Sequence, residues 1–188
     1  MARPASKDPG SKQSGVKKPA RGTKKKSSKK AGANRKTALA FKPRAQYAAL
    51  PFRTDPQLEV LLVTSRETGR WVIPKGWPIR GKSRRATAEA EARQEAGVIG
   101  EIGKSPLGQY DYVKVLKTGL AIPCRVTVFP LRVTGQKERW REQAQRTGRW
   151  FDGETAAACV QEPQLAAIIR RFVLDGPPSA NPEPQPKA

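Results

Sequence analysis

The segment 72–100, VIPKGWPIRGKSRRATAEAEARQEAGVIG, constrains the fold more than any other part of the chain. Residues 74–81 contain two prolines and two glycines, and this composition predicts a structured loop. Residues 83–96 lack both residue types and are rich in Ala, Glu and Arg, which predicts a helix. Ser83 or Thr87 is expected to cap the start of this helix, and the glycine that follows it to end it. Any fold of this chain must therefore place this loop directly before this helix.

The acidic residues of the predicted helix have a spacing that matters for chemistry. At about 100° per residue, Glu91 and Glu95 fall on nearly the same face, Gln94 flanks that face, and Glu89 points away from it. Two like charges at this spacing repel each other, and a hard divalent cation such as Mg²⁺ would reverse that penalty. An exposed polar helix face has the same spacing, so the pattern alone leaves both interpretations open.

The residue types that are missing narrow the possible chemistry. The chain has no histidine, which excludes Ser-His and Cys-His catalysis and His-bound zinc. Cys124 and Cys159 are too few for a disulfide framework and lack metal-ligand spacing. Metal or acid–base chemistry must therefore use carboxylates, lysine, tyrosine or backbone oxygens. The apolar runs are too short for a transmembrane helix or a secretory signal, so we expect a cytoplasmic protein without membrane association.

The formal net charge of +21 favours polyanionic partners such as nucleic acid, polyphosphate or phosphorylated small molecules. Residues 1–39 are rich in Lys, Ser, Gly, Ala and Pro, which predicts a disordered Lys-rich arm that either keeps the protein soluble or associates with RNA or polyphosphate. Residues 176–188 are rich in proline and predict a disordered tail. One folded domain is therefore expected at residues 40–175.

The domain alternates strand-like and helix-like segments. Strands are predicted at residues 45–53, 58–66, 71–73, 98–103, 105–116, 121–133 and 149–152, and helices at 83–96, 153–160 and 164–173. The last helix is amphipathic, with Leu165, Ile168, Ile169 and Phe172 on one face. Strands around one central helix, followed by a C-terminal helix, predict a mixed α/β layered domain.

The loop–helix segment resembles the Nudix box, GX5EX7REUXEEXGU, in which U is an aliphatic residue. Aligned without gaps, Gly76 is the first glycine of the box, Glu91 the Glu of RE and Glu95 the last Glu of EE, and Gly97 and Val98 form its end. The flanking strand segments agree, so the resemblance covers the whole predicted domain. It is greatest to the branch of diphosphoinositol polyphosphate phosphohydrolases and diadenosine polyphosphate hydrolases.

This resemblance implies an α/β/α sandwich, with a mixed sheet, the Nudix loop–helix and a C-terminal helix. It also implies Mg²⁺ or Mn²⁺ bound by the backbone carbonyl of Gly76 and the carboxylates of Glu91 and Glu95. Many members of the family use one more acid outside the box, before a late Trp-Phe strand. Glu138 and Glu142 occupy such a position here, and we favour Glu142 as the third catalytic acid; a solvated charged loop is the alternative.

Five basic residues are candidates for binding substrate phosphates. Each would be an ordinary surface charge if it stood alone, but together, near the predicted metal ligands, they indicate a site for several phosphates. They are Arg53, Arg70, Lys75, Arg80 and Lys82.

The segment departs from the box at three positions: Lys82 replaces its first Glu, Ala90 its Arg and Gln94 the first Glu of EE. In the family that the segment resembles, the Glu and Arg at the first two positions pair with each other, so the loss of both is expected to leave no buried charge unpaired. Gln94 matters more, because an amide cannot act as a base and is a weaker metal ligand than a carboxylate.

The expected function is a metal-dependent pyrophosphohydrolase that cleaves a phosphoanhydride of a diphosphoinositol polyphosphate or dinucleoside polyphosphate. The alternatives are an RNA 5′-end pyrophosphohydrolase and a non-catalytic module that binds nucleotides or RNA.

Overall fold

A computed structural model describes residues 42–116 and 118–177 of the chain. The predicted arm at residues 1–39 lies outside the described residues, as does the predicted tail from residue 178 onward. In the described part, no helix has the length and apolar character needed to cross a membrane.

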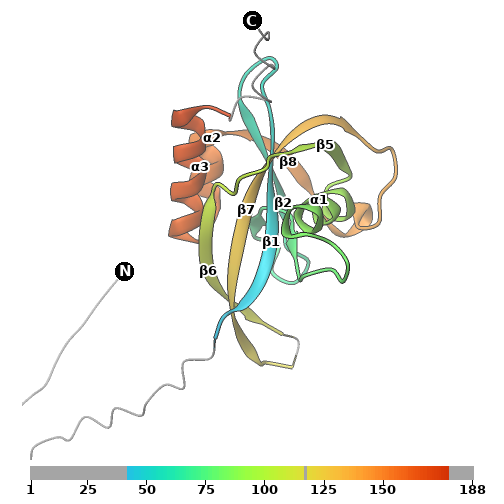
Figure 1. Cartoon of the computed structure of the whole chain (residues 1–188), viewed down its shortest axis with the longest axis vertical. Coiled ribbons are helices and arrows are strands. Elements are labelled where there is room, and N and C mark those ends of the chain that lie inside the picture. The colour runs from blue at the N-terminus through green and yellow to red at the C-terminus, as the bar shows by residue number, and fades with distance from the viewer. Residues whose placement is uncertain (1–41, 117, 178–188) are drawn as a thin grey trace, which may run out of the picture. The chain divides into compact units, whose positions relative to one another are not determined.

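A single mixed sheet of eight strands forms the centre of the described domain (Figure 1). The strands are β1 (Arg44–Arg53), β2 (Glu59–Thr64), β3 (Trp71–Val72), β4 (Lys75–Gly76), β5 (Val98–Ile102), β6 (Gly108–Val115), β7 (Ala121–Gln136) and β8 (Gly148–Asp152). The hydrogen-bonded order is β3-β2-β1-β7-β5, while β4 pairs with β1, β6 with β7 and β8 with β2. Among the strand pairs of residues 42–116 and 118–177, only β1 with β7 is parallel.

Helices cover both faces of this sheet, as Figure 1 shows, with α1 (Arg84–Glu95) on one side and α2 (Gly153–Cys159) and α3 (Pro163–Asp175) on the other. Side chains of β1 alternate between the two layers, so that Leu50 belongs to the core under α2 and α3 and Ala49 to the core under α1. The α1 side contributes the fully buried Ala88 and Ala92, whose small side chains let the helix approach β1 closely. The predicted α/β/α sandwich is confirmed.

Local sequence explains where α1 begins and ends. The Ser83 hydroxyl accepts a hydrogen bond from the backbone N–H of Ala86 at 3.1 Å, so Ser83 is the cap and the alternative, Thr87, is not. Thr87 lies inside the helix with a buried hydroxyl that has no partner among the described residues. Gly97 follows the helix with φ of 71°, a left-handed conformation that glycine adopts readily.

The loop predicted at residues 74–81 is only partly a loop, because it contains the short strand β4. Gly76 of β4 lies opposite Tyr47 of β1, and Lys75 opposite Ala48. This pairing holds the glycine of the box against the central strand, directly beside the helix that carries the acids. The other strands and helices form as predicted, with ends that differ by a few residues, and α3 buries Leu165, Ile169 and Phe172 on its predicted face.

Candidate active site

A cleft of about 1070 Å³ opens beside the C-terminal half of α1. Its lining includes β4, the acidic face of α1, residues 111–115 of β6 and the segment before α3. The loop between β2 and β3 and the loop between β7 and β8 complete the rim. Segments that are far apart in the chain therefore contribute to one cavity, and the predicted residues Arg70, Lys75, Gly76, Glu91, Glu95 and Glu142 all line it.

The carboxylate of Glu91 lies directly on the backbone of Gly76. A Cβ atom added at Gly76 would lie 2.2 Å from Glu91 Cδ, so only glycine leaves room for this carboxylate. Within the described part of the chain, no side chain forms an ion pair or hydrogen bond with it. Burial raises the pKa of Glu91, and the nearby charge of Glu142 raises it further. Glu91 is thus a partly buried acid whose oxygens remain available to a ligand.

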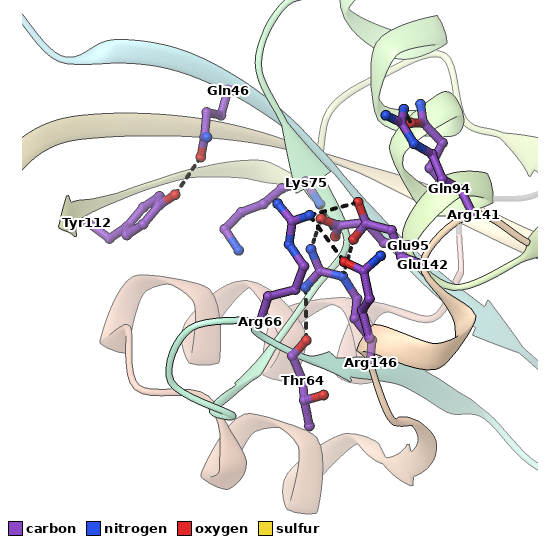
Figure 2. A network of polar contacts seen from close by, with 11 residues as sticks. Gln46, Thr64, Arg66, Lys75, Gln94, Glu95, Tyr112, Arg141, Glu142 and Arg146 are labelled. Carbon is purple, nitrogen blue, oxygen red and sulfur yellow. Dashed lines mark hydrogen bonds and ion pairs between the residues drawn. The ribbon is translucent and has the colours of Figure 1, made fainter. Parts of the chain in front are cut away.

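Glu95 and Glu142 are held together by one arginine, Arg146 (Figure 2). Arg146 Nη2 donates to Glu95 Oε1 in a very short contact, and its Nε donates to Glu142 Oε2 at 2.7 Å. A third donor, Nη1, reaches the backbone carbonyl of Thr64 at 2.9 Å. The predicted catalytic acids of α1 and of the β7–β8 loop therefore meet in space through a buried cation.

Burial shifts the pKa values of Glu95 and Lys75 toward each other. The pKa of Glu95 rises to about 7, mainly because burial disfavours its charged form, although Arg146 and Lys75 oppose this shift. The pKa of Lys75 falls to about 8, again mainly through burial, while Glu95 opposes the shift. The backbone N–H of Lys75 also donates to Glu95 Oε2 at 3.1 Å, which fixes the carboxylate in the wall of the cleft. Groups that titrate near neutral pH suit proton transfer.

Gln94 also lines the cleft, but it contacts another arginine. Arg141 Nη1 donates to Gln94 Oε1 at 2.8 Å, and the backbone N–H of Glu142 donates to the backbone carbonyl of Gln94 at 3.2 Å. The side chain and the backbone of Gln94 together therefore dock the β7–β8 loop onto α1. Glu89, by contrast, pairs with Arg93 at 3.3 Å outside the cleft, as its position on the helix predicts.

Two of the five predicted phosphate-binding residues line the cleft. Lys75 Nζ lies 5.5 Å from the centre of the Tyr112 ring, and no carboxylate pairs with this ammonium group within the described part of the chain. Arg70 lies 5.7 Å from the centre of the same ring and forms a very short ion pair with Glu162. The Tyr112 hydroxyl donates to Gln46 Oε1 at 2.7 Å, and this hydrogen bond fixes the ring, as Figure 2 shows.

Arg53, Arg80 and Lys82 do not line the cleft. Arg53 ends β1, five residues or about 17 Å beyond the β4 pairing, where it forms an ion pair with Glu59 at 2.5 Å. Arg80 and Lys82 are exposed and follow Ile79, the last residue of this loop that lines the cleft. Their position within the box did not place these two basic side chains in the cleft.

Arg66, Arg141 and Arg146 are cleft residues that the sequence reasoning missed. They come from the β2–β3 and β7–β8 loops, whose positions depend on the folded chain. For Arg146 a sequence signal existed, because Glu142 precedes it by four residues, a spacing that favours an ion pair.

The donor atoms of the site fit one hard divalent cation. Carboxylate and carbonyl oxygens are the ligands that Mg²⁺ and Mn²⁺ prefer, and Glu91 presents a free carboxylate beside the backbone of Gly76. No group of three or more acidic or cysteine side chains, however, is arranged to hold a metal within the described residues. In Figure 2, one oxygen of Glu95 and one oxygen of Glu142 are bound by Arg146.

The chain belongs to the Nudix hydrolase family, as the sequence resemblance predicted. It is 35% identical over 153 residues to diphosphoinositol polyphosphate phosphohydrolase 3-alpha of Mus musculus, in a match that covers 77% of this chain and 88% of the relative. It is 33% identical over 144 residues to the Homo sapiens protein of the same name, covering 74% and 82%.

Solved structures share the fold. The crystal structure of a C. elegans Ap4A hydrolase binary complex matches with a TM-score of 0.54 at 18% identity, covering 70% of this chain and 96% of that one. At this identity the likeness concerns the fold alone. No family model matches the sequence.

Proposed function

We propose that this protein is a divalent-metal-dependent pyrophosphohydrolase that cleaves a phosphoanhydride bond in a phosphate-rich substrate. The observation that carries the proposal is the free Glu91 carboxylate on Gly76, in a cleft that also holds Glu95, Glu142 and the unpaired ammonium of Lys75. Glu91 and the Gly76 carbonyl would hold Mg²⁺ or Mn²⁺, while Glu95, which the family resemblance also implies as a ligand, is paired with Arg146. The cation would neutralise charge on the phosphate oxygens and activate water.

The side chains of the cleft have distinct roles in this proposal. Lys75 and Arg70 bind substrate phosphates, since both line the cleft and lie 5.5 Å and 5.7 Å from the centre of the Tyr112 ring. Water attacks phosphorus, the anhydride P–O bond breaks, and the proton of the water passes to a carboxylate. Glu95 suits this last role because its pKa is raised to about 7. Glu142 is held beside it by Arg146.

The proposed substrate class follows from the relatives and from the cleft. The similar proteins of Mus musculus and Homo sapiens are named for diphosphoinositol polyphosphates, and the similar C. elegans structure for Ap4A. A cleft of about 1070 Å³ offers room for a ligand of either kind. We therefore place diphosphoinositol polyphosphates and dinucleoside polyphosphates first, and nucleotide sugars and nucleoside triphosphates after them.

The test is phosphate release from a panel of these substrates, and of 5′-triphosphorylated RNA, with Mg²⁺ or Mn²⁺. Glu91→Gln and EDTA should each abolish turnover of the preferred substrate. The matched control is Glu89→Gln, the same substitution on the same helix but outside the cleft, which should leave turnover unchanged. Equal turnover in Glu91→Gln and Glu89→Gln would refute the assigned site.

One observation favours a second function, a non-catalytic module that binds nucleotides or RNA. Gln94 replaces an acid of the box and is engaged by Arg141, while the two other acids near it are paired with Arg146. Binding of the same panel without turnover under any metal condition would favour this function over the enzyme.

A further inference from the structure

Arg146 is an internal cation between two acids that were expected to serve metal chemistry. Its side chain is 7% exposed, those of Glu95 and Glu142 are 8% and 13% exposed, and all three line the cleft. Its Nη2 contacts Glu95, its Nε lies 2.7 Å from Glu142, and its Nη1 lies 2.9 Å from the Thr64 carbonyl. The guanidinium is thus anchored on three sides.

The balance of charge in this network depends mainly on Arg146, with Lys75 as a second cation near Glu95. Two buried carboxylates without a counter-ion would repel each other and lose hydration, and both effects are large in a buried site. The only other cation paired with either acid in the described part of the chain is Arg66, which is 48% exposed and lies 3.5 Å from Glu142. An exposed contact at that distance contributes little, so Arg146 carries most of the compensation.

Glu91 differs from the other two acids, since its carboxylate lies free on Gly76. A first divalent cation can therefore bind at Glu91 without removing the guanidinium of Arg146. A second cation between Glu95 and Glu142 would have to displace a planar, always charged group that already makes three hydrogen bonds.

We infer that Arg146 is a positioning residue that takes the place of a second divalent cation. It holds the carboxylates of Glu95 and Glu142 beside each other and limits the site to one metal ion per chain. The inference rests on the proposed metal site at Glu91 and Gly76, and it adds a property of this chain that the site alone does not imply.

Metal binding by the full-length chain without substrate tests the inference. Calorimetric titration with Mn²⁺ should give one site in the wild type. Arg146→Gln should bind a second Mn²⁺, or bind Mn²⁺ at least about tenfold more tightly, because Glu95 and Glu142 become available. The matched control, Arg66→Gln, removes a charge from the same cleft but not the bridge, and should behave like the wild type.

Thermal unfolding gives a second readout. In EDTA, the melting temperature of Arg146→Gln should fall by roughly 10 °C, because two buried acids lose their counter-ion, and Mg²⁺ should restore at least half of the loss. Arg66→Gln should show neither effect. If Arg146→Gln does not fold, Arg146→Lys keeps the charge but cannot bridge both acids, and it should still raise the Mn²⁺ affinity.

The inference is overturned if the wild type binds two Mn²⁺ ions, or if number and affinity of sites are the same in Arg146→Gln, Arg146→Lys and Arg66→Gln. It is also overturned if Mg²⁺ stabilises Arg146→Gln no more than the wild type. Failure of the proposed hydrolase looks different: no substrate is turned over, while the titrations still show whether removing Arg146 creates a site.

Discussion

The Glu91 carboxylate and the Gly76 backbone are in direct contact, and the absence of one methyl group at residue 76 makes this possible. The contact joins α1 to the short strand β4, which is itself paired with β1. The free acid of the cleft thus rests on the central part of the sheet. Substitutions at residue 76 should therefore weaken metal binding more than they lower the free energy of unfolding.

Gly76→Ala should weaken Mn²⁺ binding by about 10–100-fold, because a Cβ would overlap the Glu91 carboxyl group and push it aside. The flexible Glu91 side chain can yield, so the free energy of unfolding should fall by only about 1 kcal/mol. Calorimetric titration and chemical denaturation measure the two effects. Gly135→Ala is the control, since a Cβ there meets nothing within 4 Å; equal Mn²⁺ affinity in both variants would contradict this account of Gly76.

Gln94→Glu should restore an acid to the box. Because the new carboxylate should form an ion pair with Arg141, it should contribute little to metal binding and turnover. The arginine already contacts this side chain at 2.8 Å, and the new carboxylate would pair with it. We expect a small gain in Mn²⁺ affinity and kcat/KM for Gln94→Glu, and a gain about tenfold larger when it is combined with Arg141→Gln. The four variants of this double-mutant cycle are compared in the substrate assay. If the double variant is no better than Gln94→Glu, then Arg141 does not control this position.

Lys75→Met should raise KM by about tenfold or more, with a smaller effect on kcat, because the charged group binds phosphate before and during the reaction. It should also raise the free energy of unfolding by about 1–3 kcal/mol, since burial disfavours the ammonium and lowers its pKa to about 8. Steady-state kinetics and denaturation test both points. Lys82→Met, outside the cleft, should change neither KM nor the free energy of unfolding. A similar rise in KM for Lys82→Met would show that Lys82 also binds the substrate.

Arg70→Met should destabilise the protein by about 3 kcal/mol, because it leaves Glu162 buried without its ion-pair partner. Combining it with Glu162→Gln should recover most of this loss. The equivalent cycle on the exposed pair Arg93 and Glu89 should show a coupling of only about 0.3–0.5 kcal/mol. Urea denaturation of the two sets measures the difference, and equal coupling energies would show that burial of the Arg70 pair is unimportant.

Much of the fold was predictable because it depends on local patterns. Alternating apolar runs predicted the long strands, and Ser83 and Gly97 marked the ends of α1. The ends of the strands were less predictable, since pairing with neighbours extends β7 to Gln136 and turns Lys75–Gly76 into β4. Hydrogen bonds to a distant strand leave little trace in a short segment.

The sequence by itself determined the acidic face of α1, the glycine that precedes it and the absence of any histidine, because helix spacing and composition require no tertiary contact. Only the tertiary structure decided which cations reach that face. Arg146 is 51 residues from Glu95 and 82 from Thr64, and it meets them because the β7–β8 loop folds back over α1. Arg80 and Lys82, much closer in sequence, stay outside because the chain leaves the cleft after Ile79 and exposes both side chains to solvent.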